Sequence, residues 1–435
     1  MGQINRESLF AGEAALGRRS FLALAGLGTA ASLMPSAAWA LAAEDYPAVK
    51  AGIEALVASK KYPNAFVAIG KGLMAPDILQ VGNMALDSNI APDMDTLWRV
   101  YSMTKPITGM AAMILVGEGK IKLDQPIADF LPEFASMTVL TDPKNSLDAV
   151  PAKTQITLRH LLTHTAGLGY SIVTKGPLLK AYLDNGITPG AVSRMPIPGF
   201  ESGAPVPDID TFSKRLGKLP LIAEPGTKWS YSVATDLLGH LIGVVSGMEF
   251  EAFLKQRIFG PLKMNSTYFQ VPDVETKRLV TNYGGLGTFL LPIDPGTNSI
   301  FIDKPAFPSG GGGLVTSTRD YDQFLKMLIN DGSLDGQRIL SPEMVALGTS
   351  NLLPAGVKFS DGKAGFGAAA RVGIGARAGE YGWGGAAGTI AAVQRKQKIR
   401  LIGMTQVMSR DNNALQQGLL KWMIEDMLGS TAKAA

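Results

Sequence analysis

The chain has 435 residues, a formal net charge of +4 and no cysteine. A chain of this length exceeds one typical hydrophobic core, so we expect two domains or one large composite domain. The missing cysteines exclude disulfides, thiol catalysis and cysteine-ligated metals. Because the charge is small and no basic run stands out, nothing points to a nucleic-acid partner.

The first 40 residues resemble a twin-arginine export signal. The pair Arg18-Arg19 precedes an apolar run of small residues, 21–34, and Ala38-Trp39-Ala40 has the small-x-small form of a cleavage site. The apolar run is too short and too rich in glycine and alanine for a good membrane span. The segment predicts a periplasmic or secreted protein without stable membrane insertion, and a frayed amphipathic N-terminus is the alternative.

Beyond residue 40 the hydrophobic periodicity predicts helices alternating with short strands. Helices are expected over 44–60, from Ser102 to Gly117, and over 157–168, 232–245, 250–259 and 411–427. Strands are expected over 65–69, 78–81, 367–372, 389–394 and 399–407. Residues 276–300 are expected to form a loop. Residues 170–220, rich in turn formers, predict a lid or pocket wall, with a variable surface insertion as the alternative.

Ser102 and Lys105 form a Ser-x-x-Lys pattern at the start of a long apolar helix. Their spacing puts both side chains on the same face, one helical turn apart. A serine hydroxyl is a weak nucleophile until a neighbour takes its proton, and a suitably placed amine can do this. Many chains carry the pattern by chance on solvated helix faces, so alone it is a weak indication of catalysis.

Two other stretches have both a binding interpretation and a structural one. His160 and His164 are four residues apart, but no third ligand or intervening glutamate supports a metal site, so both are expected to be structural. The glycine run 310–313 lacks the Gly-Lys-Ser/Thr ending of a phosphate loop. We interpret it as a close approach of the backbone beneath a site, and neither a cofactor nor a metal is expected.

Three motifs, taken in order, resemble those of the serine β-lactamase and penicillin-binding superfamily, and most of all those of family VIII carboxylesterases. They are Ser102-x-x-Lys105, Tyr231-Ser232 and Trp383-Gly384-Gly385. Further matching stretches are 161–168, 224–226, 259–264 and 311–314. Each motif is weak alone, whereas several in the right order and spacing are specific.

The resemblance implies a role for each matching residue. Ser102 attacks the carbonyl carbon and is acylated, while Lys105 and Tyr231 take its proton and later return it. Two interacting titratable groups of this kind act as a unit, so neither is named as the base. The backbone amides of Ser102 and Ala386 are implied to form the oxyanion hole. The small residues Gly384-Gly385 let the substrate lie against the strand.

The chain departs from the superfamily in two of these motifs. Trp383 stands where lactamases and D,D-peptidases commonly carry the lysine of Lys-Thr-Gly, so a carboxylate anchor is lost and apolar surface is gained. Val233 replaces the usual asparagine and cannot hydrogen-bond an acyl-side amide. Both residues are expected to contact the substrate. They favour plain esters with an uncharged, apolar acyl group and count against β-lactams.

The function implied by the resemblance is hydrolysis of small to medium carboxylic esters through an acyl-enzyme on Ser102. One alternative is a penicillin-interactive enzyme, that is, a β-lactamase, a D-aminopeptidase or a D,D-peptidase. The others are an acyltransferase that uses the same residues and a non-catalytic envelope binding protein. The chain contains no Gly-x-Ser-x-Gly elbow, which counts against an α/β-hydrolase triad. A small-molecule ester is the expected partner.

The implied fold is of the β-lactamase/transpeptidase type, an α+β sandwich in which an antiparallel β-sheet is flanked by helices. The sheet and its helices are expected to come from 41–101 and 301–435. A mostly helical domain, 102–300, is inserted between them and includes the lid-like segment 170–220. The site is expected between the two parts, a usual place for ligands.

Overall fold

The computed structural model describes residues 46–188, 190, 192–195, 206–286, 289–408 and 414–434. The predicted export signal, residues 1–40, lies outside these ranges. The signal, and the localisation that follows from it, therefore stay predictions.

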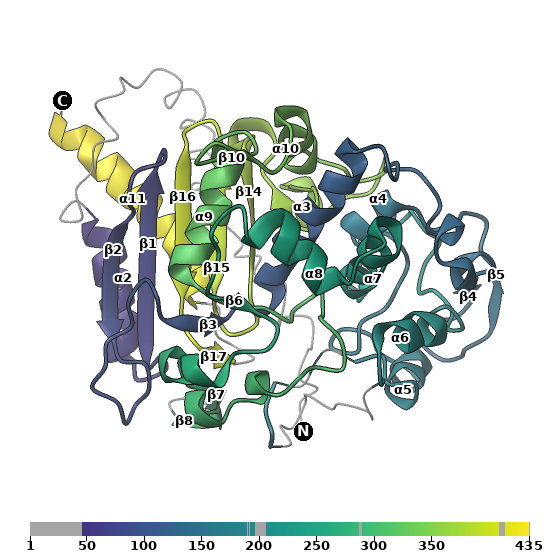
Figure 1. The fold of residues 1–435 in the computed structure, drawn as a ribbon, viewed down its shortest axis with the longest axis horizontal. Helices are drawn as coiled ribbons and strands as arrows, with labels where there is room; N and C mark the ends of the chain where they lie inside the picture. The colour runs from purple at the N-terminus through teal and green to yellow at the C-terminus, as the bar shows by residue number, and fades with distance from the viewer. Residues whose placement is uncertain are drawn as a thin grey trace.

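An antiparallel sheet forms the centre of the described structure (Figure 1). Seven strands of the described residues take part, in the order β12-β13-β14-β15-β16-β1-β2. They are β1 (Asn64–Lys71), β2 (Asp77–Gly82), β12 (Gly365–Phe366), β13 (Arg371–Val372), β14 (Glu380–Gly384), β15 (Ile390–Gln394) and β16 (Ile399–Met404). Phe66 pairs with Met404 and Trp383 with Ala391. The predicted antiparallel sheet is confirmed, with strands from an N-terminal segment and from the C-terminal third.

Burial explains which strands the sequence predicted well. β1 is buried from Asn64 to Gly70, and its nearly continuous apolar sequence fits a strand that is covered on both faces. The single strand expected over 367–372 is wrong. The chain forms β12 and β13 instead, and Ala369 takes φ +56 in the turn between them. That left-handed residue reverses the chain where the hydrophobic pattern continues unbroken.

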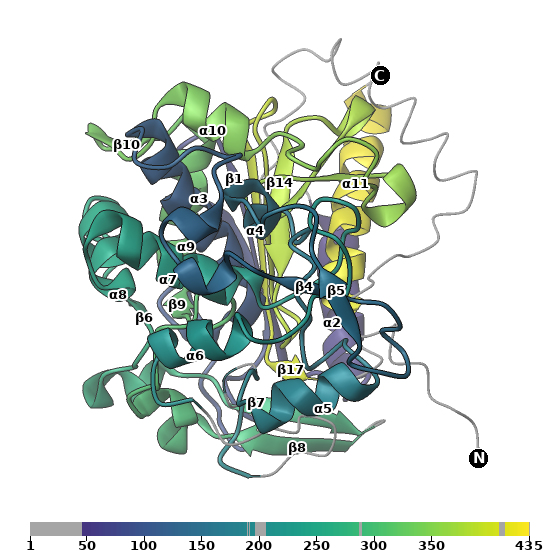
Figure 2. The same cartoon turned by 90° about the vertical axis from the view of Figure 1, so that its right-hand side faces the viewer.

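Helices cover both faces of the sheet. α2 (Pro47–Ala58) and α11 (Ala414–Ala434) pack together on one face, while α9 (Thr318–Ile329) and α3 (Thr104–Gly117) lie on the other (Figures 1 and 2). The outer pair shares an apolar core with β1 through Val49, Ile53 and Leu415. The sheet and the helix layers on its two faces form the predicted sandwich, so the fold class is confirmed.

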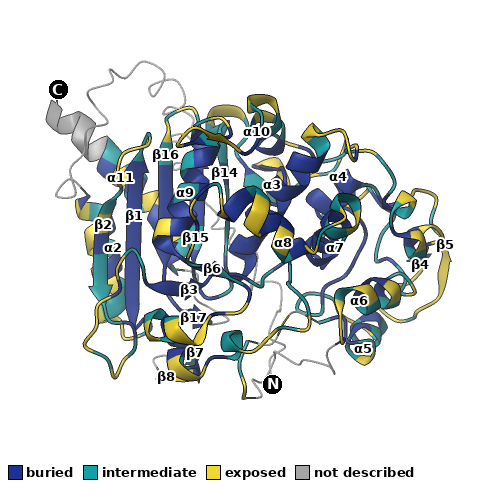
Figure 3. Ribbon diagram, in the orientation of Figure 1, coloured by how far each residue is buried: buried dark blue, intermediate teal, exposed yellow. Residues whose placement is uncertain are grey.

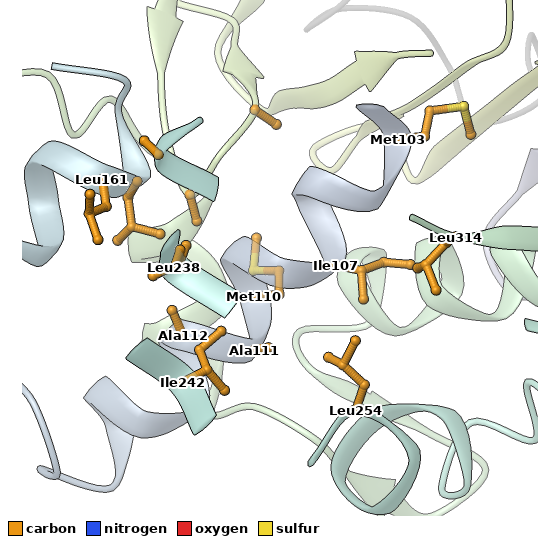
Figure 4. Close-up of a cluster of buried hydrophobic side chains, with 14 of the residues drawn as sticks. Met103, Ile107, Met110, Ala111, Ala112, Leu161, Leu238, Ile242, Leu254 and Leu314 are labelled. Carbon is orange, nitrogen blue, oxygen red and sulfur yellow. The ribbon is translucent and has the colours of Figure 1, made fainter. Parts of the chain in front are cut away.

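A second group of helices lies beside α3, on the right of Figure 1. They are α4 (Leu158–Leu162), α5 (Pro177–Asp184), α6 (Ile209–Leu216), α7 (Ala234–Ser246) and α8 (Phe250–Leu254). α3 is buried from Thr104 to Leu115, because it contacts α7, α10 (Pro342–Gly348) and β14. Figure 4 shows Met110 of α3 in one apolar cluster with Leu161 and Leu238. α3 therefore joins the helical part to the sheet.

Smaller sheets complete the described structure. β3 (Leu97–Arg99), β9 (Val315–Ser317) and β6 (Thr267–Tyr268) form one, and β17 (Val407–Met408), β7 (Asn282–Leu286) and β8 (Phe289–Asp294) form another. Two hairpins pair β4 (Thr138–Leu140) with β5 (Ala149–Pro151) and β10 (Ser333–Leu334) with β11 (Gln337–Arg338). The loop expected over 276–300 is therefore wrong. β7 pairs with β17, more than a hundred residues away, and local sequence does not reveal such a pairing.

The segment 170–220, which the sequence predicted to be a lid or pocket wall and for which no helix was predicted, contains two helices, α5 and α6. α6 begins after Asp208, whose carboxylate accepts a hydrogen bond from the Thr211 N–H. The role of this segment as a lid stays a prediction, and so do the domain boundaries.

Figure 3 shows buried residues concentrated in the central strands and in α3 and α7.

No single helix in the described part of the chain has the length and apolar character to span a membrane. One strongly bent pair, Ala234–Ser246 with Phe250–Phe259, meets the criterion on length and composition alone.

Candidate active site

Ser102 lies in a single 3₁₀ turn, Tyr101–Met103, that leads directly into α3. Lys105 follows in the first turn of α3, and its Nζ donates to Ser102 Oγ at 3.2 Å. Tyr101, just before the serine, has a φ of +41, which is uncommon for a bulky residue and marks local backbone strain next to the nucleophile. The predicted meeting of the serine and the lysine one turn apart is thus present.

Tyr231 reaches the same point from a different part of the chain. It precedes α7, and its Oη lies 2.7 Å from Ser102 Oγ, close enough for either hydroxyl to donate. Lys105 Nζ lies 4.7 Å from the centre of the Tyr231 ring. Lys105 is fully buried, Tyr231 is 4% exposed and Ser102 is 8% exposed. The three groups therefore share a contact that is largely screened from water.

The glycine run 310–313 contacts the lysine through its backbone. Lys105 Nζ donates to the Gly311 carbonyl at 2.5 Å, and the Gly311 N–H donates to Asp236 Oδ1 at 3.0 Å. Ser309 Oγ donates to the same carboxylate oxygen at 2.5 Å. A Cβ at Gly310 would lie 2.5 Å from the Thr235 carbonyl oxygen, so only glycine fits there. The run is the close backbone approach that the sequence predicted.

The third motif runs along β14 beside the serine turn. Trp383 and Tyr381 are two residues apart and so share a sheet face, and the Tyr381 hydroxyl donates to the Ala368 carbonyl at 2.7 Å. A Cβ at Gly385 would lie 2.3 Å from the Val100 carbonyl oxygen, so the two backbones are in direct contact. The Ala386 N–H, next in the chain, has no acceptor among the described residues. Of the two amides predicted for the oxyanion hole, that of Ser102 lies in the 3₁₀ turn and that of Ala386 lies outside any helix.

Val233 is 1% exposed and packs in the main apolar cluster, at the N-terminus of α7. Gly385 is also buried, whereas Trp383 and Gly384 are partly exposed. The predicted contacts of all four residues with substrate stay predictions. Ser232, between Tyr231 and Val233, turns away from the serine and hydrogen-bonds His164 Nδ1 at 3.0 Å.

His164 is a site residue that the sequence assigned only a structural role. Its ring centre lies 4.9 Å from that of Tyr231, and it has a φ of +53. Burial, and next the charge of Lys105, hold the pKa of the His164 imidazole well below its usual 6.5. The ring is therefore neutral at physiological pH and packs behind Tyr231 without adding a second cation. Its position in the 161–168 motif was the available signal.

An aromatic cluster surrounds Tyr231, and most of it has no motif in the sequence. The rings belong to His164, Tyr170, Trp229, Tyr231, Phe359, Phe366 and Trp383. Phe366 is fully buried at its centre, whereas Trp229, Phe359 and Trp383 are partly exposed. Burial raises the pKa of the Tyr170 phenol well above its usual value, so that ring remains neutral.

A metal centre has no support from these side chains. Among the residues that the structure describes, no group of three or more His, Cys, Asp or Glu side chains is placed to hold a metal ion.

The sequence matches one known protein family over most of its length. The family model described as Beta-lactamase matches residues 35–420. The chain belongs to the beta-lactamase family. This confirms the superfamily indicated by the three motifs.

Relatives of the chain include a protein without a described function and an esterase. An uncharacterized Mycobacterium tuberculosis protein is 36% identical over 62% of this chain and 62% of its own length. Esterase EstB of Burkholderia gladioli is 30% identical over 52% of this chain and 55% of its own length. The chain thus spans about three fifths of the Mycobacterium relative and rather less of EstB.

A solved structure supports the fold over a longer span. The protein described as EstCE1, a hydrolase with promiscuous acyltransferase activity, has a TM-score of 0.71 and 23% identity. The match covers 87% of this chain and 98% of that structure. At this identity the likeness shows the fold alone.

Proposed function

We propose that the protein is a serine carboxylesterase that cleaves small to medium carboxylic esters through an acyl-enzyme on Ser102. One observation carries the proposal: Ser102 Oγ contacts both Tyr231 Oη, at 2.7 Å, and Lys105 Nζ, at 3.2 Å, within a buried site. A hydroxyl with an amine and a phenol in contact is equipped to lose its proton during attack. The 30% identity to an esterase is consistent with this.

Acylation begins when Ser102 Oγ attacks the carbonyl carbon of the ester. As the Oγ–C bond forms, the hydroxyl proton passes to the Lys105–Tyr231 pair and the carbonyl oxygen gains negative charge. When the tetrahedral intermediate collapses, the bond from carbon to the alcohol oxygen breaks. The same proton then passes to that oxygen, and the alcohol leaves.

Deacylation repeats these steps with water as the nucleophile. The Lys105–Tyr231 pair takes one proton from water, the hydroxide adds to the acyl carbon, and the proton returns to Ser102 Oγ as the acid leaves. An alcohol in place of water would give acyl transfer through the same atoms, so the residues alone do not separate the two outcomes.

The negative charge of the intermediate needs hydrogen-bond donors aimed at the former carbonyl oxygen. The Ala386 N–H supports this role, because it follows the glycine that packs on the serine turn and has no acceptor among the described residues. The Ser102 N–H is the proposed second donor. One such donor typically contributes about 10²–10³ in rate.

Esters are favoured over β-lactams by the chemistry of Trp383. An indole offers apolar surface and a single donor, whereas recognition of a β-lactam carboxylate commonly uses a cation. We therefore expect neutral substrates to be preferred to anionic ones.

The test compares Ser102→Ala and Tyr231→Phe with wild type on p-nitrophenyl butyrate and on a chromogenic cephalosporin. Wild type is expected to prefer the ester, and each variant is expected to lose about 10²-fold or more in kcat/KM. Tyr268→Phe is the matched control, because the half-buried Tyr268 bonds the Asn265 carbonyl, away from the site, and should retain activity.

Two results would contradict the proposal. A preference of wild type for the cephalosporin would make the protein a β-lactamase. Retention of more than about a tenth of the rate in either variant would be incompatible with the assigned roles. Mass spectrometry after a fluorophosphonate probe gives an independent readout, with the adduct expected on Ser102.

A further inference from the structure

We propose that Trp229, Phe359 and Trp383 form a surface that binds an aromatic ring in the alcohol half of the ester. This inference rests on the proposed function and deepens it by naming a substrate class. We refer to these three residues as the aromatic face. None of the three motifs contains Trp229 or Phe359, and the substitution of Trp383 for lysine by itself suggests only apolar surface.

The aromatic face is built by three distant segments on one support. Phe359 lies 4.7 Å from Trp229 and 6.3 Å from Trp383, measured between ring centres. All three rings also contact Phe366, at 5.3–5.7 Å, and Phe366 is fully buried. The buried ring fixes the three from behind while each keeps part of its own surface exposed. A surface held this way loses little side-chain freedom when a ligand binds.

A strained turn holds Phe359 on the face. Ser360 and Asp361 have φ values of +53 and +51, and Gly362 follows at +78. The turn is closed by the Gly362 N–H, which donates to the Phe359 carbonyl at 2.9 Å. Left-handed backbone costs a serine more than an aspartate, which tolerates this conformation, so the turn has a fixed and unusual course directly after Phe359. The chain therefore tolerates strain immediately after the ring that completes the face.

The chemistry assigns this face to the alcohol half of the substrate. The alcohol oxygen receives its proton from the Lys105–Tyr231 pair, so it must lie close to Tyr231 Oη. The Tyr231 ring lies 5.9 Å from Trp383 and is stacked on Trp229 at 6.3 Å. The rest of the alcohol then passes along Tyr231 onto the aromatic face. Aromatic rings prefer offset or edge-to-face contact with other rings, which selects a planar aryl group.

The test uses esters that differ only in the alcohol or only in the acid. Benzyl butyrate and hexyl butyrate share an acid and both release primary alcohols, while ethyl phenylacetate carries its ring on the acyl side. For Phe359→Leu we expect kcat/KM to fall about fivefold on benzyl butyrate and less than twofold on the other two esters, because one ring contact is lost. Phe289→Leu is the matched control, since Phe289 is 62% exposed on β8, and should change none of the three rates.

Equal losses on benzyl and hexyl butyrate, or a loss confined to ethyl phenylacetate, would overturn the inference. If wild type cleaves no ester, the proposed function fails, and a binding measurement still decides this one. Saturation-transfer NMR should then detect benzyl alcohol on wild type, with a signal that weakens in Phe359→Leu and not in Phe289→Leu. An unchanged signal in Phe359→Leu would overturn the inference.

Discussion

Lys105 shows how a single residue is adapted to a buried reactive site. Its side chain is fully buried, and within the described ranges it forms no ion pair with a carboxylate. Its hydrogen bonds go to Ser102 Oγ and the Gly311 carbonyl, and the rings of Tyr231 and Tyr170 lie 4.7 and 5.8 Å from Nζ. A carbonyl oxygen and ring faces are therefore the polar partners of Nζ beside the serine. No carboxylate competes with Ser102 for contact with Nζ.

His164 supplies a pH-dependent prediction at the same scale. Its pKa is lowered in the folded state, so below pH 6.5 the unfolded chain binds a proton that the folded chain does not. Stability is therefore full above that pH and falls as the pH decreases, by up to about 1.4 kcal/mol per pH unit for one proton. Burial also lowers the pKa values of His160 and His240, which act in the same direction.

We expect His164→Asn to reduce this pH dependence by one proton. Asparagine tolerates the left-handed φ of +53 and retains a polar side chain toward Ser232. Urea unfolding of wild type and variant at pH 5, 6, 7 and 8 measures the effect. Identical pH profiles for the two proteins would show that His164 does not titrate as its burial requires.

The glycine run 310–313 acts at the scale of elements, because Gly310 packs against both α3 and α7. Gly310 accepts a hydrogen bond from Thr108 Oγ1 of α3 at 2.8 Å and lies against the Thr235 carbonyl of α7. A Cβ added at Gly312, two residues later, would meet no neighbouring atom closer than 3.8 Å. The two glycines therefore differ sharply in the room around them.

Gly310→Ala is expected to destabilise the protein by about 1–3 kcal/mol, because a backbone oxygen in the way cannot move without shifting a helix. Activity should fall with it, since the displaced run carries the Gly311 carbonyl that binds Lys105. Gly312→Ala, with ordinary contact distances, should retain the wild-type unfolding midpoint. Chemical unfolding and ester hydrolysis of both variants test the pair, and equal behaviour would contradict this account.

At the scale of the whole molecule, the N-terminal and C-terminal segments of the described chain pack against each other. β1 pairs with β16, and α2 packs on α11. Asp426 of α11 accepts hydrogen bonds from the Ala48 and Val49 N–H groups, at 2.7 and 3.0 Å, at the first turn of α2. The helix has no side-chain cap of its own. A carboxylate nearly four hundred residues away therefore caps it.

Removing that cap should weaken the packing of α2 on α11. Asp426→Ala is expected to lower the free energy of unfolding by about 1–2 kcal/mol, the usual range for loss of a helix cap. Glu425→Gln is the control, because Glu425 is exposed and pairs with Lys421 one turn away. Thermal unfolding measures both, and an Asp426→Ala midpoint equal to that of the control would contradict the capping role.

Local sequence predicted those parts of the fold whose signals are themselves local. β1, β2 and β15 show strand composition, and α3 shows helical spacing, so each was found close to its observed bounds. The strand predicted over 399–407 ran past the end of β16 into β17, which belongs to another sheet. β7 and β8 were missed because their pairing depends on β17, and α5 and α6 because proline and glycine around them resemble a loop.

For the site, the residues alone determined the chemical groups and their order along the chain. Their order, together with the other matching motifs, indicated the superfamily, and the resemblance to that superfamily implied the reaction class. The tertiary structure alone decided that His164 packs on Tyr231 and that Trp229, Phe359 and Trp383 share one buried support. The physical reason is that sequence spacing alone determines how far apart two side chains lie within one helix. Contacts between distant segments, by contrast, form only when burial of apolar surface brings the segments together.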